Sequence, residues 1–309
     1  MSFTEVSQEL LANWPLPWMG VATDKDARGR VLLAGGGVEV PGALILAGVG
    51  ALRSGAGKLQ LATPQSLAIA LGLSVPEARV FGLPQTAGGE LAAEGAEELA
   101  TRAQRSDAVV IGPGMLDEEA AGALAQRLAL VEECALVVDA AAMVGLARAP
   151  EAARRKGGRL VLTPHAGEMA AMLDCARATV EADPVSAARG LAAELQAVVV
   201  MKNAVTYVVS PDGRAWRHLG GSPGLATSGS GDVLAGVIGG LLARGAAPAQ
   251  AACWGVYAHG ACGRRLAERI APLGFLAREL LDEIAPALAE LTSTAPHSTA
   301  GARQLPWKV

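Results

Sequence analysis

Short apolar runs alternate along this chain with Ala- and Leu-rich segments of helical length. The apolar runs are nearly continuous, which is typical of parallel strands that are buried on both faces. Because strands and helices alternate, the pattern indicates repeated βαβ units. We therefore predict a three-layer α/β fold, a mostly parallel sheet with helices on both faces. The clearest predicted strands are Val31–Ala34, Leu59–Ala62, Ala108–Ile111, Ala135–Val138, Leu160–Leu162 and Val198–Met201.

Helical periodicity and start signals define the helices between these strands. Pro184 and Pro248 stand in predicted first turns, where proline is tolerated because the first N–H groups have no helical partner. The predicted helices are Gly42–Ser54, Glu118–Glu132, Pro184–Leu195, Gly231–Arg244, Pro248–Arg269 and Ala277–Leu291.

One segment departs from this alternation. Val205–Val209, a Ser-Pro-Asp-Gly turn and Arg214–Leu219 follow one another without a helix, which predicts an antiparallel hairpin at the edge of the sheet. No internal repeat or linker divides the chain, and α/β folds of this length often form one unit. We predict a single domain over residues 1–309, with an N-terminal extension over about residues 1–24 and a mobile tail over about residues 292–309.

Composition and charge narrow the class of protein. The 309 residues carry a formal net charge of -4 and no basic stripe, so we expect no nucleic-acid partner. The N-terminus lacks the features of a signal peptide, and the apolar stretches are too short to cross a bilayer. The four cysteines form no CxxC pair, and histidines do not cluster, which argues against zinc and a disulfide framework. We expect a cytoplasmic protein without membrane association and predict no metal-ligating residue.

The strongest chemical signal is the run Gly224–Asp232, which opens directly into a predicted helix. A small-residue loop at a helix start presents unpaired N–H groups at the positive end of the helix dipole and can bind phosphate. Asp232 would stand beside that phosphate, where its carboxylate can take a proton from an attacking hydroxyl. An N-cap role for Ser230 or Asp232 explains the same residues equally well.

Further polar or glycine-rich loops follow other predicted strands. They are Gly35–Gly37, Gly112–Gly114, Asp139, and Thr163–His165 with Glu168. Each begins at the carboxyl end of a strand, the edge where open α/β sheets bind ligands. A single loop of this kind is usually a tight turn, but four in register indicate a shared site. Lys202, directly after Val198–Met201, can meet a nucleotide phosphate or simply be solvated.

Common nucleotide and hydrolase fingerprints are absent from the sequence. It contains no P-loop, no G-x-G-x-x-G, no G-x-S-x-G and no H-E-x-x-H. A P-loop enzyme, a dinucleotide-dependent dehydrogenase and a serine or zinc hydrolase of these types are therefore not supported.

The motifs together resemble the ADP/ATP-dependent NAD(P)H-hydrate dehydratases, within the ribokinase-like superfamily. In chain order they are Lys25–Val31 leading into Gly35–Gly36, Pro41–Ala43 with Ala51–Gly57, Gly112–Gly114, Asp139–Ala140, Leu162–Glu168, Met201–Lys202 through Thr206, and Gly224–Asp232. Each motif is weak alone, but seven in the family's order are specific. The resemblance runs from about Leu10 to Leu266.

This resemblance implies a ribokinase-like sandwich that dehydrates the hydrated, damaged form of NADH or NADPH. In the family, the hydroxyl of the hydrated ring attacks the terminal phosphate of ADP or ATP, and loss of phosphate regenerates NAD(P)H with AMP or ADP released. Asp232 is implied as the catalytic base; Ala43, Gly114, His165 and Asp232 are implied at the hydrated cofactor. The implied nucleotide-binding residues are Lys202, Asn203, Ala204, Val205, Thr206, Gly229, Ser230 and Gly231. Mg²⁺ is the implied cofactor, and a homotetramer the implied assembly.

The sequence departs from the family at three places. Ala141 stands where a second acid is frequent, Ser222 where an Asn is usual, and Asn203–Thr206 where the stretch is often glycine-rich. These departures concern magnesium handling and the adenine pocket. Only 29 residues precede Arg30, so we expect the companion epimerase to be a separate protein.

Two other functions fit part of the pattern. A small-molecule kinase of the same superfamily, such as a hydroxyethylthiazole or vitamin-precursor kinase, would share the phosphate loop and Asp232, and fold alone does not separate it. Pro41–Ala43 and Thr163–Glu168 favour the dehydratase. A catalytically silent nucleotide sensor rests only on Ala141, and an intact Asp232 argues against it.

Overall fold

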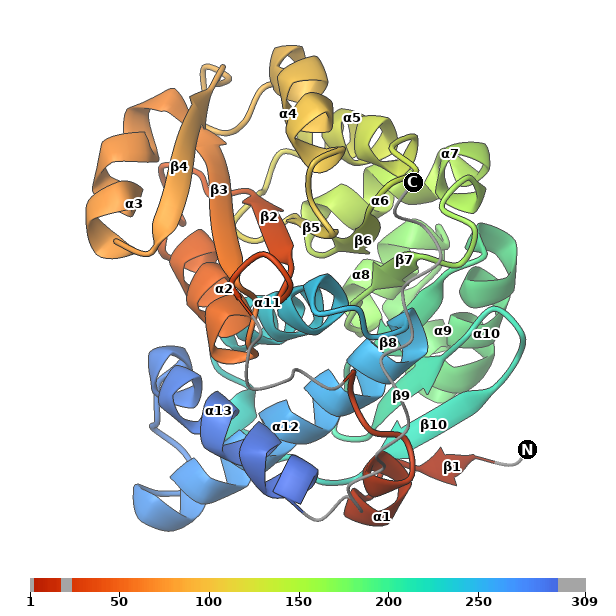
Figure 1. The fold of residues 1–309 in the computed structure, drawn as a ribbon. Helices are drawn as coiled ribbons and strands as arrows, with labels where there is room; N and C mark the ends of the chain where they lie inside the picture. The colour runs from red at the N-terminus through yellow and green to blue at the C-terminus, as the bar shows by residue number, and fades with distance from the viewer. Residues whose placement is uncertain (1–2, 18–23, 294–309) are drawn as a thin grey trace.

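The computed structural model describes residues 3–17 and 24–293, and a single ten-stranded sheet organises them (Figure 1). Its strand order is β1-β10-β9-β8-β7-β6-β5-β2-β3-β4. The strands are β1 (Thr4–Glu5), β2 (Arg30–Ala34), β3 (Lys58–Pro64), β4 (Ala78–Leu83), β5 (Ala108–Ile111), β6 (Ala135–Val138), β7 (Leu160–Leu162), β8 (Val198–Met201), β9 (Thr206–Val209) and β10 (Ala215–His218).

Strands β4-β3-β2-β5-β6-β7-β8 all run parallel. The predicted parallel sheet is therefore confirmed, and four of its six predicted strands have the predicted bounds. Strands β9 and β10 form the predicted antiparallel hairpin. Its predicted place at the edge is wrong, because Thr4 and Glu5 of β1 pair with Trp216 and Arg217 and cover β10.

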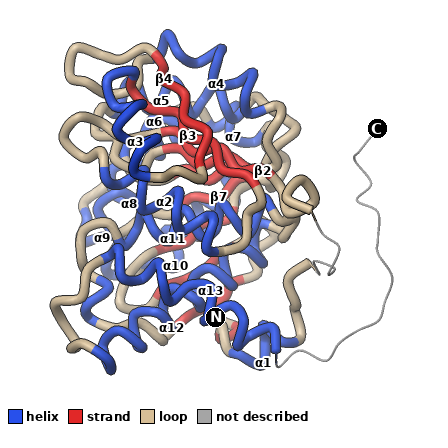
Figure 2. The backbone as a smooth tube through the Cα atoms, turned by 60° about the vertical axis from the view of Figure 1, so that its left-hand side comes forward, coloured by secondary structure: helices blue, strands red, loops and turns tan. Residues whose placement is uncertain are grey.

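Helices lie on both faces of the sheet, as predicted (Figure 2). The α-helices are α1 (Gln8–Ala12), α2 (Gly42–Arg53), α3 (Ala68–Ser74), α4 (Ala96–Ala103), α5 (Glu118–Ala129), α6 (Ala141–Ala147), α7 (Pro150–Arg154), α8 (Ala166–Met172), α9 (Arg177–Ala182), α10 (Pro184–Leu195), α11 (Ser230–Ala243), α12 (Pro248–Arg269) and α13 (Ala277–Ser293). Three short 3-10 turns are η1 (Gln65–Leu67), η2 (Ala93–Gly95) and η3 (Pro223–Leu225). All six predicted helices are present, with ends within a few residues of prediction.

Alternate side chains of the central strands enter two separate cores. Val31 and Leu33 of β2 pack with α2, α11, α12 and α13, whereas Leu32 and Ala34 pack with the layer that contains α4 to α10. This is the three-layer arrangement, since successive strand side chains point to opposite faces. Residues of both cores are mostly Ala, Val and Leu, which allows helices to approach the sheet closely.

The described residues of the N-terminal segment pack against the rest of the fold. Leu11 is fully buried, and the carbonyl of Trp14 accepts hydrogen bonds from Trp254 Nε1 at 2.9 Å and Gln250 Nε2 at 3.1 Å. At the other end, α13 continues to Ser293, past the predicted start of the tail, and residues 294–309 lie outside the described part.

No described helix combines the length and apolar character needed to cross a membrane. The four cysteines are all free thiols, three of them buried.

Candidate functional site

Glycine loops from neighbouring strands pack against one another at the carboxyl edge of the sheet. The Gly36 amide, after β2, donates to the carbonyl of Pro113, after β5, at 2.8 Å. A Cβ at Gly112 would lie 1.8 Å from the carbonyl oxygen of Asp139, and φ at Gly112 is +121°, so only glycine fits there. The three loops are thereby fixed relative to one another, and they bring Asp139 to the centre of this edge.

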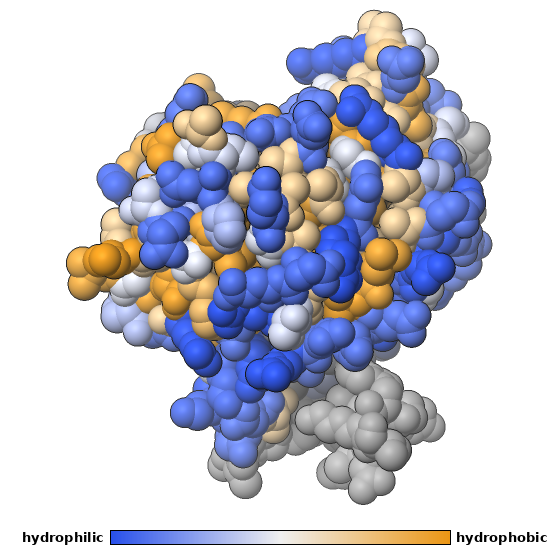
Figure 3. Space-filling model, turned by 90° about the horizontal axis from the view of Figure 1, so that it is seen from above, coloured by the Kyte–Doolittle hydropathy of each residue, from blue (hydrophilic) through white to orange (hydrophobic). Residues whose placement is uncertain are grey.

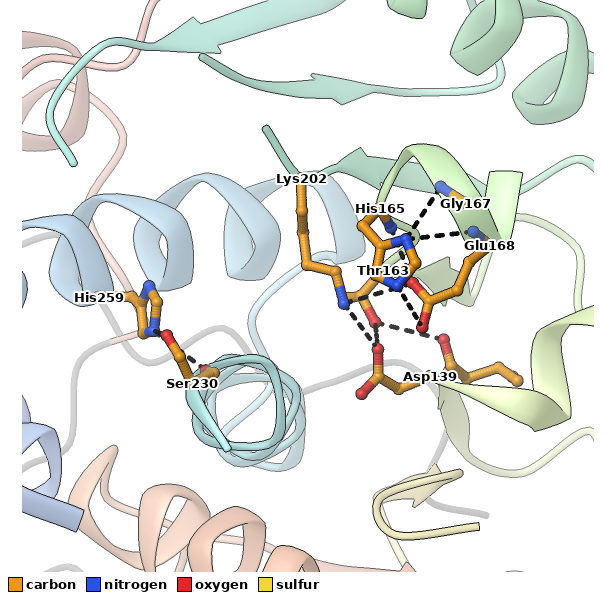
Figure 4. A network of polar contacts seen from close by, with 9 residues as sticks. Asp139, Thr163, His165, Gly167, Glu168, Lys202, Ser230 and His259 are labelled. Carbon is orange, nitrogen blue, oxygen red and sulfur yellow. Dashed lines mark hydrogen bonds and ion pairs between the residues drawn. The ribbon is translucent and has the colours of Figure 1, made fainter. Parts of the chain in front are cut away.

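Asp139 anchors a buried network of charges (Figure 4). Its side chain is 5% exposed and accepts hydrogen bonds from Thr163 Oγ1 at 2.6 Å and from Lys202 Nζ at 3.1 Å. Lys202 Nζ also lies 3.7 Å from Glu168 Oε2. Burial acts to lower the pKa of Lys202, but the carboxylates of Asp139 and Glu168 outweigh it and raise that pKa. Lys202 is therefore held as a fixed cation.

The start of α11 faces this cation. Gly229, the N-cap, has φ +88°, and a Cβ there would lie 2.5 Å from Leu46 Cδ1. A Cβ at Gly231 would lie 3.4 Å from Lys202 Nζ, so the first turn of the helix and the ammonium group are neighbours. Unpaired N–H groups, a helix dipole and a lysine thus converge on one space, which is the arrangement that binds phosphate.

Asp232 lies in the first turn of α11, as predicted. Burial, followed by the neighbouring carboxylate of Asp139, raises the pKa of Asp232 from its ordinary 3.8 to about 7, although Lys202 opposes the shift. A carboxyl group with such a pKa can exchange a proton near neutral pH, which suits general acid–base chemistry.

A cleft of about 760 Å³ opens beside this network. We call it the carboxyl-edge cleft, and its lining residues are His165, Lys202, Asn203, Ala204, Thr206, His218, Gly221, Ser222, Pro223, Leu225, Ala226, Thr227, Ser230, Gly231, Leu234, Val256, His259 and Gly260. Six of the eight predicted nucleotide residues line it. Val205 stands between two of them in the chain, and Gly229 is the N-cap of α11, two positions before Gly231.

The predicted residues for the second substrate fall into two groups. Gly114 and Ala43 are neighbours, because a Cβ at Gly114 would lie 2.9 Å from that of Ala43. Neither lines the carboxyl-edge cleft, whereas His165 does. The Lys202 amide donates to the Pro164 carbonyl at 2.7 Å. His165 is therefore tied to the end of β8, where Lys202 lies, rather than to the glycine loops.

His165 also has a structural role that the sequence left open. Its Nδ1 accepts from the amides of Gly167 at 3.0 Å and Glu168 at 3.2 Å, and Glu168 Oε2 accepts from the His165 amide at 2.8 Å. This reciprocal pair is a capping box at the start of α8. The His165 side chain is still 58% exposed and lines the cleft, and its Nε2 lies 3.6 Å from Glu168 Oε1.

Sequence reasoning missed His259 on α12. Its Nε2 lies 3.0 Å from Ser230 Oγ, and burial lowers the pKa of His259 to about 4, so it is neutral and fixes the first residue of α11. His259 stands within an ordinary helical pattern, and no local signal marks it. Asp139 did carry a signal, its place at a strand end, but no local pattern identified its partners.

Among the described residues, no group of three or more His, Cys, Asp or Glu side chains is arranged to hold a metal ion. Two acidic side chains of this edge, Asp139 and Glu168, instead direct oxygens toward Lys202.

Comparison with known proteins identifies consistent relatives. The family model described as NAD(P)H-hydrate dehydratase matches residues 31–286. An ADP-dependent (S)-NAD(P)H-hydrate dehydratase of Xanthomonas campestris is 48% identical over 279 residues, 90% of this chain and 94% of that protein. A bifunctional NAD(P)H-hydrate repair enzyme of Moorella thermoacetica is 37% identical over 276 residues, 88% of this chain but 52% of that protein. This chain therefore spans about half of the bifunctional relative.

A solved structure has the same fold. The ADP/ATP-dependent NAD(P)H-hydrate dehydratase of Bacillus subtilis, co-crystallised with ATP and Mg²⁺, superposes with a TM-score of 0.78 at 27% identity, covering 94% of this chain and 99% of that one.

Proposed function

Because this chain belongs to the NAD(P)H-hydrate dehydratase family, we propose that it dehydrates hydrated NADH or NADPH with ADP or ATP as co-substrate. NAD(P)H, inorganic phosphate and AMP or ADP are the products. The observation that carries this proposal is the juxtaposition of Asp232, whose pKa is about 7, with Lys202 and the first turn of α11.

We propose Asp232 as the base. The hydroxyl oxygen of the hydrated ring forms a bond to the terminal phosphorus, while Asp232 accepts the hydroxyl proton. The bond from phosphorus to its bridging oxygen breaks, and AMP leaves from ADP, or ADP from ATP. Departure of the phosphate with its bonding electrons, together with loss of a ring proton, then restores the ring double bond. The fixed ammonium of Lys202 and the N–H groups of α11 stabilise charge on the transferred group.

We propose that the nucleotide occupies the carboxyl-edge cleft, with its phosphates toward Lys202 and Gly231. The lining also includes apolar residues such as Leu225 and Val256, which suit a nucleobase. The remaining nucleotide residues of this proposal are Asn203, Ala204, Val205, Thr206, Gly229 and Ser230.

We place the hydrated nicotinamide ring between Asp232 and the Ala43–Gly114 contact. The glycine loops permit close approach of a ligand to the backbone, since neither Gly36 nor Gly114 has a side chain. His165 would contact this substrate from the cleft side.

We propose Mg²⁺ as the companion of the nucleotide. Asp139 and Asp232 are the neighbouring carboxylates that would contact the ion, and Asp139 Oδ1 also accepts a hydrogen bond from Lys202 Nζ at 3.1 Å. Phosphate oxygens would supply the other ligands, as is usual for Mg²⁺. When bound, the ion neutralises charge on the phosphates.

We further propose a cytoplasmic homotetramer that works with a separate epimerase. The link to epimerisation is supported by relatives that are named bifunctional repair enzymes and are about twice as long. The kinase alternative predicts phosphorylation of an alcohol without nicotinamide chemistry, and the silent sensor predicts no turnover.

One assay separates these functions. The protein is incubated with hydrated NADH and ADP, or ATP, and the absorbance of reduced nicotinamide is followed, with Asp232→Asn as the matched control. We expect nucleotide-dependent recovery of NADH absorbance only with the unsubstituted protein. Nucleotide binding without recovery under any of these conditions would contradict the proposal.

A further inference from the structure

A second cleft, of about 590 Å³, lies at the opposite, amino edge of the sheet. Its lining residues are Lys25, Arg30, Gly57, Lys58, Leu59, Gln60, Glu77, Arg79, Phe81, Glu98, Thr101, Arg102 and Arg105. We call it the amino-edge cleft. It shares no lining residue with the carboxyl-edge cleft, and the proposed dehydration assigns it no role.

The register of three strands forms the floor of this cleft. Arg30, the first residue of β2, pairs with Lys58, the first residue of β3, and Gln60 pairs with Arg79 of the edge strand β4. Since side chains of paired residues project to the same face, these polar groups form one surface. Helix α4 covers the carboxyl half of this face, where Ala62 and Leu83 enter the core with Leu99, and leaves the amino half open.

Positive charge gathers at this cleft in an otherwise acidic protein. Six of its lining residues are Lys or Arg and two are Glu, whereas the whole chain has a formal net charge of -4. Asp26 offsets part of the charge through contacts with Lys58 and Arg30. Glu98 offsets a further part of it through an ion pair with Arg102. Within the described residues, Arg79 and Arg105 are in no ion pair, and both side chains are exposed. A cleft with an excess of positive charge concentrates anions.

Two of the arginines are also held in place by hydrogen bonds: Arg30 Nη1 donates to the Arg105 carbonyl at 2.7 Å, and Arg102 Nη2 donates to Glu98. Arg102 lies over the Phe81 ring with its Cζ 3.4 Å from the centroid, and the Arg79 Cζ lies 4.9 Å from it. Guanidinium groups match phosphate oxygens in geometry.

From these observations we propose that the amino-edge cleft is a second binding site, separate from the catalytic one, for a small anion with two or more phosphate groups. Phosphate is favoured over an aromatic ligand because Arg102 already occupies a face of Phe81, the cleft's aromatic side chain. A linear polyphosphate fits the row of cations formed by Arg30, Lys58 and Arg79, which lie at or next to the first residues of β2, β3 and β4. On the face shown in Figure 3, hydrophilic and apolar side chains are interspersed.

The test uses the full chain and inorganic tripolyphosphate, titrated by calorimetry. The carboxyl-edge cleft also binds phosphates, so titrations are repeated in Lys202→Ala, in which that site is weakened. In this background we expect Arg79→Ala with Arg105→Ala to weaken tripolyphosphate binding roughly tenfold or more, because two charge-assisted contacts are removed. Both residues are exposed, so their removal leaves the core intact. Arg278→Ala, an exposed arginine on α13 outside both clefts, is the matched control and should leave binding unchanged.

In the chain with Lys202 intact, the Arg79→Ala, Arg105→Ala pair should leave ADP-dependent turnover unchanged. Equal tripolyphosphate affinity with and without the pair would overturn the second site. Binding of a polyglutamate peptide of equal charge as tightly as tripolyphosphate would overturn the assignment to phosphates and indicate an acidic protein segment. Neither result depends on whether the chain dehydrates NAD(P)H, so failure here is distinguishable from failure of the proposed function.

Discussion

At the scale of single residues, the burial that raises the pKa of Asp232 also suits this residue to exchange a proton near neutral pH. Its pKa of about 7 means that the folded chain holds a proton between pH 3.8 and about 7 that the unfolded chain has released. Stability therefore falls as pH rises through that window and is level above it. The active base is the deprotonated form, so activity has the opposite pH dependence.

This opposition gives a paired prediction for Asp232→Asn. We expect turnover to fall by roughly a hundredfold or more, the effect of losing a general base. In the unsubstituted protein, kcat/KM should rise with pH and level off above about 7. The variant should be more thermostable than the parent above pH 7, because a buried charge is removed, and the difference should shrink toward pH 4. Denaturation and kinetics across this range check both parts. A parent whose activity is flat with pH would contradict the assignment of Asp232 as the base.

Lys202 interacts with the carboxylates of Asp139, Glu168 and Asp232, and these interactions raise its pKa. Lys202→Ala should weaken ADP or ATP binding roughly tenfold or more while affinity for the hydrated cofactor changes little. It should also move the pH limb of kcat/KM upward, because Lys202 opposes the raised pKa of Asp232. Calorimetry with each substrate and a pH profile measure these effects. Unchanged nucleotide affinity would leave Lys202 as a structural partner of Asp139 only.

His165 requires a variant pair because it both caps α8 and lines the cleft. His165→Ala should lower stability by about 0.5–2 kcal/mol through loss of the N-cap. His165→Asn supplies another good N-cap and should restore the melting temperature. If His165 positions the hydrated cofactor, both variants raise the KM for that substrate and leave the nucleotide KM unchanged. A rise in the nucleotide KM alone would assign His165 to the nucleotide, with which the structure groups it.

The site itself was only partly readable from sequence. The glycine loop before Asp232 is local and has a known physical use, so it was found. Asp139 and Lys202 stand 63 positions apart, and Ser230 and His259 stand 29 apart, so their contacts depend on how strands and helices pack. No local pattern contains that information.

At the scale of elements, the strength of the local pattern decided what could be predicted. Long helices such as α10 and α12, each with proline in its first turn, were predicted with their observed bounds. Strand β4 was missed because as an edge strand it mixes exposed Arg79 with buried Phe81. Helices α1, α3, α4 and α6 to α9 were missed because each has only five to eight residues, too few for a periodic signal.

Helix α11 reaches its position through glycine contacts with α2. A Cβ at Gly236 would lie 2.0 Å from the Ala47 carbonyl oxygen. Gly236→Ala should therefore separate the helices, lower the melting temperature and reduce turnover, since Asp232 lies on the same helix. Gly190→Ala on α10 is the matched control, because nothing lies within 4 Å of its added Cβ. It should stabilise the protein by about 0.5–1 kcal/mol. Equal behaviour of the two variants would show that the contact with α2 does not position α11.

At the scale of the whole molecule, one sheet joins segments from both ends of the sequence. Strand β1 adds to β10, and α1 packs near α13, although these elements are far apart in the chain. The sequence predicted the alternation of strands and helices correctly because burial imposes it locally. It did not predict that residues 3–17 add an edge strand and a helix to the fold, because a two-residue strand and a five-residue helix have no recognisable period.

The N-terminal segment is therefore predicted to unfold together with the rest of the protein. Leu11 is fully buried in the core that contains α11 to α13. Leu11→Ala should lower the free energy of unfolding by about 2–5 kcal/mol, through lost burial and the cavity left behind. Gln8→Ala, at an exposed position of the same helix, should change it by less than about 0.5 kcal/mol. Urea denaturation measures both, and the slope of the free energy with urea should stay the same. A large effect on local protease cleavage near Leu11 without a shift of the global transition would contradict a single cooperative core, because it would mean that this segment opens independently of the sheet.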